Sequence, residues 1–313
     1  MQKPVALLIL ILVSLAAAGG TSNVLDLMPK SVRQMGLSGI KSATLLSGSR
    51  GTYEASTTTL NGKYDFTTMQ AKLPFGDDFY FAGAGVALSG RITARAYWAQ
   101  ISGGDVELTS NIDSITDADT IAYKVDNRIS YSDNIATLLF QAELLDSFFT
   151  GITIKWIKSG KDSFQTDVAS LDIGASFPMF FKNVSAAFLF RNAVTLGLNS
   201  KSRDETAAQE LRTAFSFTAL SGKAALYTEL GITMSEKLMY EPVLGLEWNL
   251  NRFLDVRSGI SYQSGSRRPD FAGGFSLNVG GFYLDYALVS KSDLGFEGGH
   301  RISAGYTIGI DYD

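Results

Sequence analysis

Apolar and polar residues alternate with a period of two over most of this chain, from about residue 64 to the C-terminus. A β-strand places successive side chains on opposite faces, so this pattern predicts strands with one apolar and one polar face. No stretch shows the 3.6-residue apolar spacing of an amphipathic helix, and no linker divides the chain. The sequence therefore predicts a single all-β domain.

The alternating segments are long and numerous. We expect about 14 strands, and each strand with its turn takes roughly 20 residues. The predicted strands are residues 62–73, 78–89, 91–102, 128–144, 147–159, 165–177, 183–192, 208–219, 223–233, 241–250, 252–263, 270–279, 281–290 and 300–310. One or two further strands are expected before residue 62. Strands in globular proteins have about 5–6 residues, whereas about 10–12 are needed to cross a bilayer at a tilt.

The two faces of the predicted strands differ in charge. One face is strongly apolar, as in Ile152, Ile154, Trp156, Phe188 and Phe190. The other face carries one charged residue on each of nine strands: Lys155, Asp172, Arg191, Arg212, Glu229, Glu247, Arg257, Asp285 and Arg301. A transmembrane barrel turns its apolar face to lipid and its polar face to the lumen, and closure satisfies every backbone hydrogen bond. A soluble β-sandwich or a β-rich surface-layer protein would also alternate, but the strand length favours a transmembrane antiparallel β-barrel.

The nine inward charges are the candidate functional residues. Acidic and basic side chains nearly balance among them, which argues against a strongly ion-selective pore. We interpret them either as a structural network of ion pairs or as part of a solute path. Glu229, Glu247 and Arg257 lie on three consecutive predicted strands, so we expect a cross-strand network there.

The N-terminus has the features of a secretory signal. Lys3 precedes an apolar run from Val5 to about Ala18, with small residues at Ala16 and Ala18. A retained N-terminal anchor is the alternative. Only 19% of residues are charged, and 31 are glycine against 6 proline, which is unusual for a cytosolic enzyme. The absence of cysteine excludes disulfides and thiol catalysis, and a net charge of −4 gives no electrostatic case for nucleic acid.

Residues for catalysis or metal binding are scarce. His300 is the single histidine, so a Ser-His-Asp site or a transition-metal site is not expected. The acidic stretch 103–127 does not have the spacing of a calcium loop, and we interpret it, like 199–210, as a solvated loop. No enzymatic activity, cofactor or metal is predicted.

Two predicted hairpins have distinctive sequences: "FYLDYALVSKSDLG" followed by "HRISAGYTIG" at the end of the chain, and "FFTGITIKWIKSGKDSFQTDVASLDIGASF" earlier. The first resembles the closing hairpin of the PorV/PorQ-type proteins of the FadL-like outer-membrane barrels, and the second is similar to an earlier hairpin of that family. "VSAAFLFRNA" and "PVLGLEWNLNRFLDVRSGISY" resemble further strands, and "VRQMGLSGI" (32–40) resembles the segment that enters the lumen as a plug. The pieces occur in the right order over residues 30–312.

The resemblance implies an outer-membrane barrel with a short N-terminal hatch. The expected organisation is a signal peptide at 1–18, a plug segment with a possible first strand at 19–61, and a β-barrel at 62–313. The implied functions are an envelope scaffold, as in type IX secretion, or a conduit for hydrophobic solutes. A non-transporting structural protein of the envelope is the alternative. Expected partners are membrane lipids and either a hydrophobic small molecule or a secretion-system protein.

Overall fold

The computed structural model describes residues 26, 31–43, 52–56, 60, 62–72, 77–111, 123–161, 164–179, 183–198, 207–234, 238–264, 268–290 and 299–309. The predicted signal peptide lies outside them. A short helix, α3 (Val32–Gly36), precedes the sheet. The strands are β1 (Tyr64–Lys72), β2 (Asp78–Ser89), β3 (Ile92–Asn111), β4 (Tyr123–Leu145), β5 (Phe148–Lys161), β6 (Phe164–Pro178), β7 (Val184–Gly197), β8 (Gln209–Ala219), β9 (Ala224–Met234), β10 (Leu238–Asn251), β11 (Leu254–Ser261), β12 (Asp270–Val279), β13 (Phe282–Val289) and β14 (Gly299–Ile308), with a 3-10 turn η2 (Leu220–Gly222) between β8 and β9.

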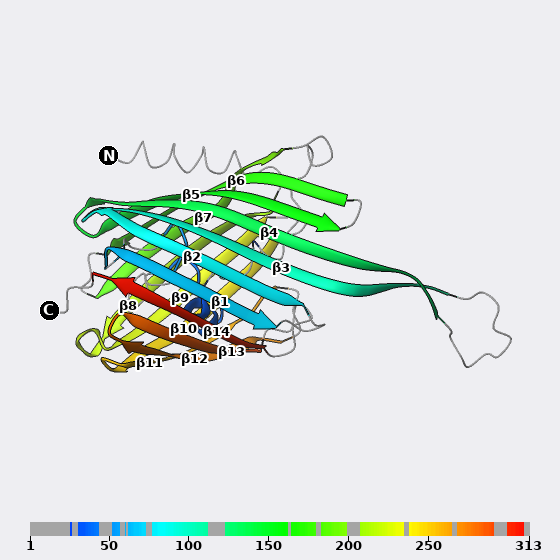
Figure 1. The fold of residues 1–313 in the computed structure, drawn as a ribbon. Helices are drawn as coiled ribbons and strands as arrows, with labels where there is room; N and C mark the ends of the chain where they lie inside the picture. The colour runs from blue at the N-terminus through cyan, green and yellow to red at the C-terminus, as the bar shows by residue number, and fades with distance from the viewer. Residues whose placement is uncertain are drawn as a thin grey trace.

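The strands form one closed antiparallel barrel (Figure 1). Each strand pairs with its neighbours in the sequence, and β1 pairs with β14 from Tyr64 opposite Ile308 to Gln70 opposite Ile302. The predicted all-β barrel of about 14 strands is confirmed. The further strands expected before residue 62 fall mostly outside the described residues, and residues 52–56, which are described, are not a strand. β1 pairs with β14 and β2 on its two sides.

Large apolar side chains cover the outer surface of the barrel. Ile152, Ile154 and Trp156 on β5 are 47–52% exposed, although they sit in the middle of a continuous sheet. All three tryptophans of the chain are also on this surface, Trp98 and Trp156 on β3 and β5 and Trp248 near the β10–β11 turn. Exposed apolar strands edged by aromatic residues are the signature of a surface that contacts lipid.

One end of the barrel carries short turns and the other carries longer connections. At the end with the longer connections, β3 and β4 extend far beyond their neighbours (Figure 1). Their outer parts pair only with each other, because β2 accompanies β3 as far as Ser102 and β5 accompanies β4 as far as Tyr131. The interpretation of 103–127 as a loop is therefore wrong at both ends, which continue the strands. Residues 103–127 are mostly polar, so they lack the alternation of apolar and polar residues from which we predicted the strands.

The outer face of β7 is interrupted by a bulge. Asn192 has a positive φ of 52°, and the β6–β7 register shifts between Leu171 and Ile173. Arg191, Asn192 and Ala193 lie opposite Asp172 alone, so there are two extra residues and the alternation continues in phase at Val194 and Leu196. Phe190 pairs with the outward residues Ile173 and Leu211, as expected, although it is only 7% exposed.

The described N-terminal residues lie inside the barrel. α3 packs against β12 and β13, and residues 31–43 and 52–56 are buried throughout (Figure 1). We call Asp26 together with 31–43 and 52–56 the luminal segment. Among the described residues, no helix has the length and apolar character needed to cross a membrane.

Candidate site in the barrel lumen

All nine charged side chains that the sequence pointed to the lumen are buried, with 1–5% of their surface exposed. The structure divides them into two clusters and one isolated residue. The first cluster contains Lys155, Asp172, Arg191, Arg212 and Glu229. The second contains Glu247, Arg257 and Asp285. Arg301 stands apart, and its guanidinium donates to the backbone carbonyl of His300 over 3.0 Å.

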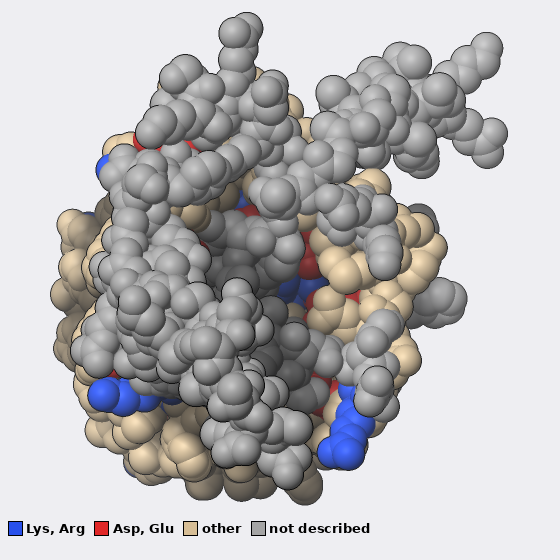
Figure 2. All heavy atoms as spheres, turned by 90° about the vertical axis from the view of Figure 1, so that its right-hand side faces the viewer, with Lys and Arg blue, Asp and Glu red and all other residues tan. Residues whose placement is uncertain are grey.

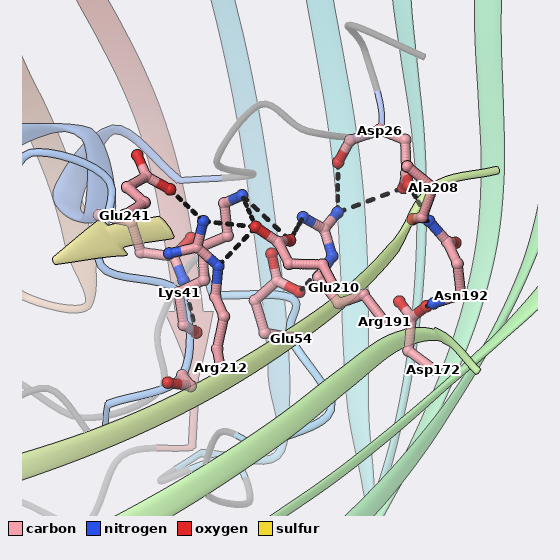
Figure 3. Close-up of polar contacts among 12 residues, drawn as sticks. Asp26, Lys41, Glu54, Asp172, Arg191, Asn192, Ala208, Glu210, Arg212 and Glu241 are labelled. Atoms are coloured by element: carbon pink, nitrogen blue, oxygen red, sulfur yellow. Dashed lines mark hydrogen bonds and ion pairs between the residues drawn. The ribbon is translucent and has the colours of Figure 1, made fainter. Parts of the chain in front are cut away.

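The first cluster holds the carboxylate of Asp26 from the luminal segment (Figure 3). Lys155 Nζ lies 2.9 Å from Asp26 Oδ1 and 2.7 Å from Asp172 Oδ1. Arg191 Nη2 lies 3.2 Å from Asp26 Oδ1, and the Asn192 amide donates to Asp26 Oδ2 over 2.7 Å. The β7 bulge makes this possible, since it points Arg191 and Asn192 into the lumen together. Asp26 is thus paired with two cations from the barrel wall.

The same cluster continues around Arg212 (Figure 3). The Arg212 guanidinium contacts three carboxylates, those of Glu210, Glu229 and Glu241. Glu210 also pairs with Arg191 at 2.9 Å and with Lys41 of the luminal segment at 3.3 Å. Opposite charges therefore alternate from β5 to β10 and continue into the luminal segment. Figure 2, viewed from the end with the longer connections, shows charged atoms of both signs in the interior.

The Glu229 side chain binds the backbone of the luminal segment. Its Oε2 accepts hydrogen bonds from the amide nitrogens of Lys41 and Ser42 at 3.1 and 2.7 Å, and from the Ser42 hydroxyl at 2.6 Å. Hydrogen bonds to an ionised acceptor are stronger than those between neutral groups. This carboxylate therefore fixes the path of residues 41–42 along the wall.

The second cluster receives Arg33 from α3. Arg33 lies 3.5 Å from Glu247, which also lies 3.8 Å from Arg257, and Arg257 lies 3.8 Å from Asp285. The expected network of Glu229, Glu247 and Arg257 was therefore only partly right. Glu247 and Arg257 are direct cross-strand partners, whereas Glu229 pairs with Arg212 on the preceding strand.

The lumen wall is apolar along β1–β6 toward the longer connections. Six inward residues on six adjacent strands are directly paired in register, and all are at most 4% exposed: Met69, Phe81, Ala99, Ile135, Ile157 and Val168. We call this the inner apolar row. Lys155 and Ser170 lie two residues along the same strands, so the row borders the first charge cluster.

Glycines in the barrel wall leave room for the backbone of the luminal segment. Gly151 and Gly174 are paired across β5 and β6. A Cβ added at Gly174 would lie 2.4 Å from the backbone nitrogen of Ser56, and one at Gly151 would lie 2.3 Å from the carbonyl oxygen of Ala55. Backbone can approach the wall this closely only where side chains are absent.

Sequence reasoning missed several members of the clusters. Glu210 was assigned to a polar loop, although it shares the face of Arg212 two residues later, and that spacing was the available signal. Asp26, Arg33 and Lys41 precede the alternating region, so no periodicity marked them. His300 lies at the start of β14 on the outer surface, where Nδ1 is 2.6 Å from the Tyr286 hydroxyl. Within the described ranges, no group of three or more His, Asp or Glu side chains is placed to hold a metal ion.

Comparison with known proteins identifies the type of barrel. No protein-family model and no curated protein matches the chain. Among solved structures, the toluene transporter TbuX of Ralstonia pickettii is similar, with a TM-score of 0.64, 9% identity, and coverage of 91% of this chain and 100% of that one. The toluene transporter TodX of P. putida has a TM-score of 0.61 and 10% identity, with coverage of 92% and 100%. The chain therefore has the FadL-like fold of outer-membrane barrels, in agreement with the predicted location.

Lys41 gives this site a pH dependence that can be measured. Burial and the nearby Arg212 guanidinium lower the pKa of Lys41 from 10.5 to about 8, against the opposing effect of Glu210. Between pH 8 and 10.5 the folded protein then binds fewer protons than the unfolded chain, so this group makes folding more favourable as pH rises. We expect the free energy of unfolding, measured by urea titration, to rise between pH 7.5 and 10 relative to Lys41→Met, by up to about 3 kcal/mol. Identical pH profiles for the two proteins would contradict this assignment.

Proposed function

We propose that the protein is an outer-membrane conduit for hydrophobic solutes, and that the luminal segment is its hatch. The observation that carries the proposal is the inner apolar row. A channel for polar solutes has a polar lumen, whereas a binding site for an apolar solute is lined mainly by hydrophobic side chains. Here the apolar lining is continuous over six strands and borders the first charge cluster.

The hatch role is supported by how the luminal segment is attached. Asp26, Arg33 and Lys41 each pair with charges on the barrel wall, and α3 occupies the interior beside β12 and β13. Ion pairs and hydrogen bonds can be exchanged one at a time, so a segment held by them can move without unfolding the barrel. The two similar solved proteins are named as toluene transporters, and a small aromatic hydrocarbon is therefore our first probe.

Uptake of radiolabelled toluene tests the conduit. We expect cells of a channel-deficient host that express the protein to take up toluene faster than cells with an empty vector. Ile135→Asn places an amide in the inner apolar row and should reduce the initial rate about tenfold, because an apolar solute cannot satisfy a buried polar group. Val243→Asn, on the opposite side of the lumen beside Leu37 and Ile40, is the matched control and should retain the rate.

Two results would overturn the conduit. One is uptake by the wild type no faster than by vector-only cells, measured with barrels that still shift in gel mobility on boiling. The other is equal loss of uptake in Ile135→Asn and Val243→Asn. Equal loss would mean that the inner apolar row has no special part in passage.

A scaffold of the PorV type, as in type IX secretion, is the second candidate. It is favoured by the outer parts of β3 and β4, which project beyond the barrel as a two-stranded ribbon (Figure 1). Under this proposal the protein, purified from its native membrane, carries a stoichiometric partner that is lost when residues 105–129 are deleted, and toluene uptake does not exceed background. A purely structural envelope protein would show neither uptake nor a partner.

A further inference from the structure

The outer surface of the barrel carries a groove of about 680 Å³ across β2–β6. Its floor follows one row of directly paired residues, Ala82, Trp98, Ala136, Trp156 and Ala169, in which alanine and tryptophan alternate from strand to strand. We call this the Ala–Trp row. The next row toward the short turns contains Ala84, Ala96, Leu138 and Ile154, which also line the groove. Two indole rings thus stand above a floor of alanines.

Small side chains in the floor distinguish this groove from a row on β10–β12. On β10–β12 the row formed by Leu244, Ile260 and Phe271 carries large side chains on consecutive strands, and these are 36–56% exposed. On β2–β6, alanine replaces such residues at alternate strands, while Trp98 and Trp156 remain 41% and 52% exposed. The shape therefore comes from the residues chosen and not from a break in the sheet, since pairing through this region is continuous.

The groove begins at the edge of the lipid-contacting surface. The row immediately beyond the Ala–Trp row, toward the longer connections, is polar: Tyr80, Gln100, Asn134, Lys158 and Asp167. Tryptophan favours the boundary between hydrocarbon and head groups. The polar row therefore lies at head-group level, and the groove runs from there into the hydrocarbon layer. Longer connections face the exterior in bacterial barrels, so this boundary belongs to the outer leaflet.

We propose that this groove is a binding site for one lipid of the outer leaflet that carries acyl chains and a phosphate. An acyl chain lies along the alanine floor between Trp98 and Trp156, where the lipid-contacting surface already requires hydrocarbon contact. The phosphate lies at the polar row, within reach of Lys158. The amides of Gln100 and Asn134 offer further donors, and both are held in place by hydrogen bonds of 3.0 Å to the Ser132 hydroxyl. The groove lies on the outer face of the same strands whose inner face carries the inner apolar row.

Binding is tested by native mass spectrometry of the full-length protein in detergent, titrated with palmitoyl-oleoyl-phosphatidylglycerol. We expect one lipid to bind more tightly than the others. Ala136→Leu fills the centre of the floor and should weaken that binding about tenfold, since it removes the contacts of roughly two methylene groups. Ala304→Leu is the matched control, because Ala304 is an outward alanine on β14, opposite Leu284 and Thr68 and outside the groove. Lys158→Gln should weaken binding of the phospholipid but not of the uncharged diacylglycerol with the same chains.

The proposal is overturned if Ala136→Leu and Ala304→Leu bind lipid like the wild type, or if no lipid is retained more tightly than the rest. A dimer that disappears in Ala136→Leu alone would also overturn it, by assigning the groove to a second copy of the chain. Each variant is first checked for the gel-mobility shift on boiling, so that loss of the barrel is not mistaken for loss of the site. Toluene uptake should be unchanged in Ala136→Leu, which separates this site from the conduit.

Discussion

Arg212→Met is expected to lower the free energy of unfolding by about 3–5 kcal/mol, the usual cost of leaving buried charges without their partner. Arg212 neutralises Glu210, Glu229 and Glu241, and the side chains of Arg212, Glu210 and Glu229 are at most 2% exposed. Without the guanidinium, Arg191 and Lys41 would be the remaining cations beside Glu210. The measurement is the urea midpoint of β-sheet circular dichroism in detergent micelles.

Arg91→Met is the matched control for this experiment. Arg91 pairs with Asp146 at 3.4 Å, but the two side chains are 63% and 97% exposed. Solvated pairs contribute at most about 1 kcal/mol, so this variant should unfold close to the wild type. Arg212→Lys should fall between, because an ammonium retains the charge but cannot span three carboxylates as a planar guanidinium does. Equal midpoints for Arg212→Met and Arg91→Met would contradict the cluster as a source of stability.

Gly174→Val should release residues 52–56 from the lumen wall while leaving the barrel closed. The new side chain meets the backbone of Ala55 and Ser56, which has no rotamer by which to withdraw. Overpacking of this kind costs about 1–3 kcal/mol, which corresponds to roughly 5- to 150-fold faster hydrogen exchange in the segment. Exchange followed by mass spectrometry on the peptide containing residues 52–56 gives this value directly.

Gly90→Val controls for the substitution itself. Gly90 lies in the β2–β3 turn, and a Cβ there meets nothing within 4 Å. It should show wild-type exchange in residues 52–56. If the luminal segment is a hatch, Gly174→Val should also raise single-channel conductance in planar bilayers, whereas Gly90→Val should not. Unchanged exchange in Gly174→Val would show that the segment does not rest on this part of the wall.

The fold could be predicted because each strand must separate lipid from lumen. That constraint applies to nearly every residue of β5–β14, and the alternation it imposes also located nine buried charges. It failed at Asn192, where a bulge buries two successive residues, Arg191 and Asn192, and in the outer parts of β3 and β4, where neither face meets lipid. Apolar and polar residues alternate only where the two faces of a strand meet different surroundings. Where the surroundings are alike, the pattern is absent and a strand cannot be predicted from it.

The division of the charges into clusters could not be predicted. Pairing depends on the stagger between strands, which decides that Arg212 meets Glu229 and that Glu247 meets Arg257. It also depends on Asp26, Arg33 and Lys41, which come from a segment without periodicity. The inner apolar row escaped notice for a related reason: Ile135 and Ile157 each adjoin an apolar residue of the outer face, Ala136 and Trp156, and the sequence alone does not show which face each occupies.

The attachment of the luminal segment has a consequence for the order of assembly. Asp26, Arg33 and Lys41 leave the ribosome before all of their ion-pair partners, which lie on strands from β5 to β10. Glu229 and Glu247 can therefore gain their full set of partners only after the later strands have been made and brought together. The first part of the chain to be synthesised is thus among the last to reach its final position, and closure of β1 against β14 must take place around it.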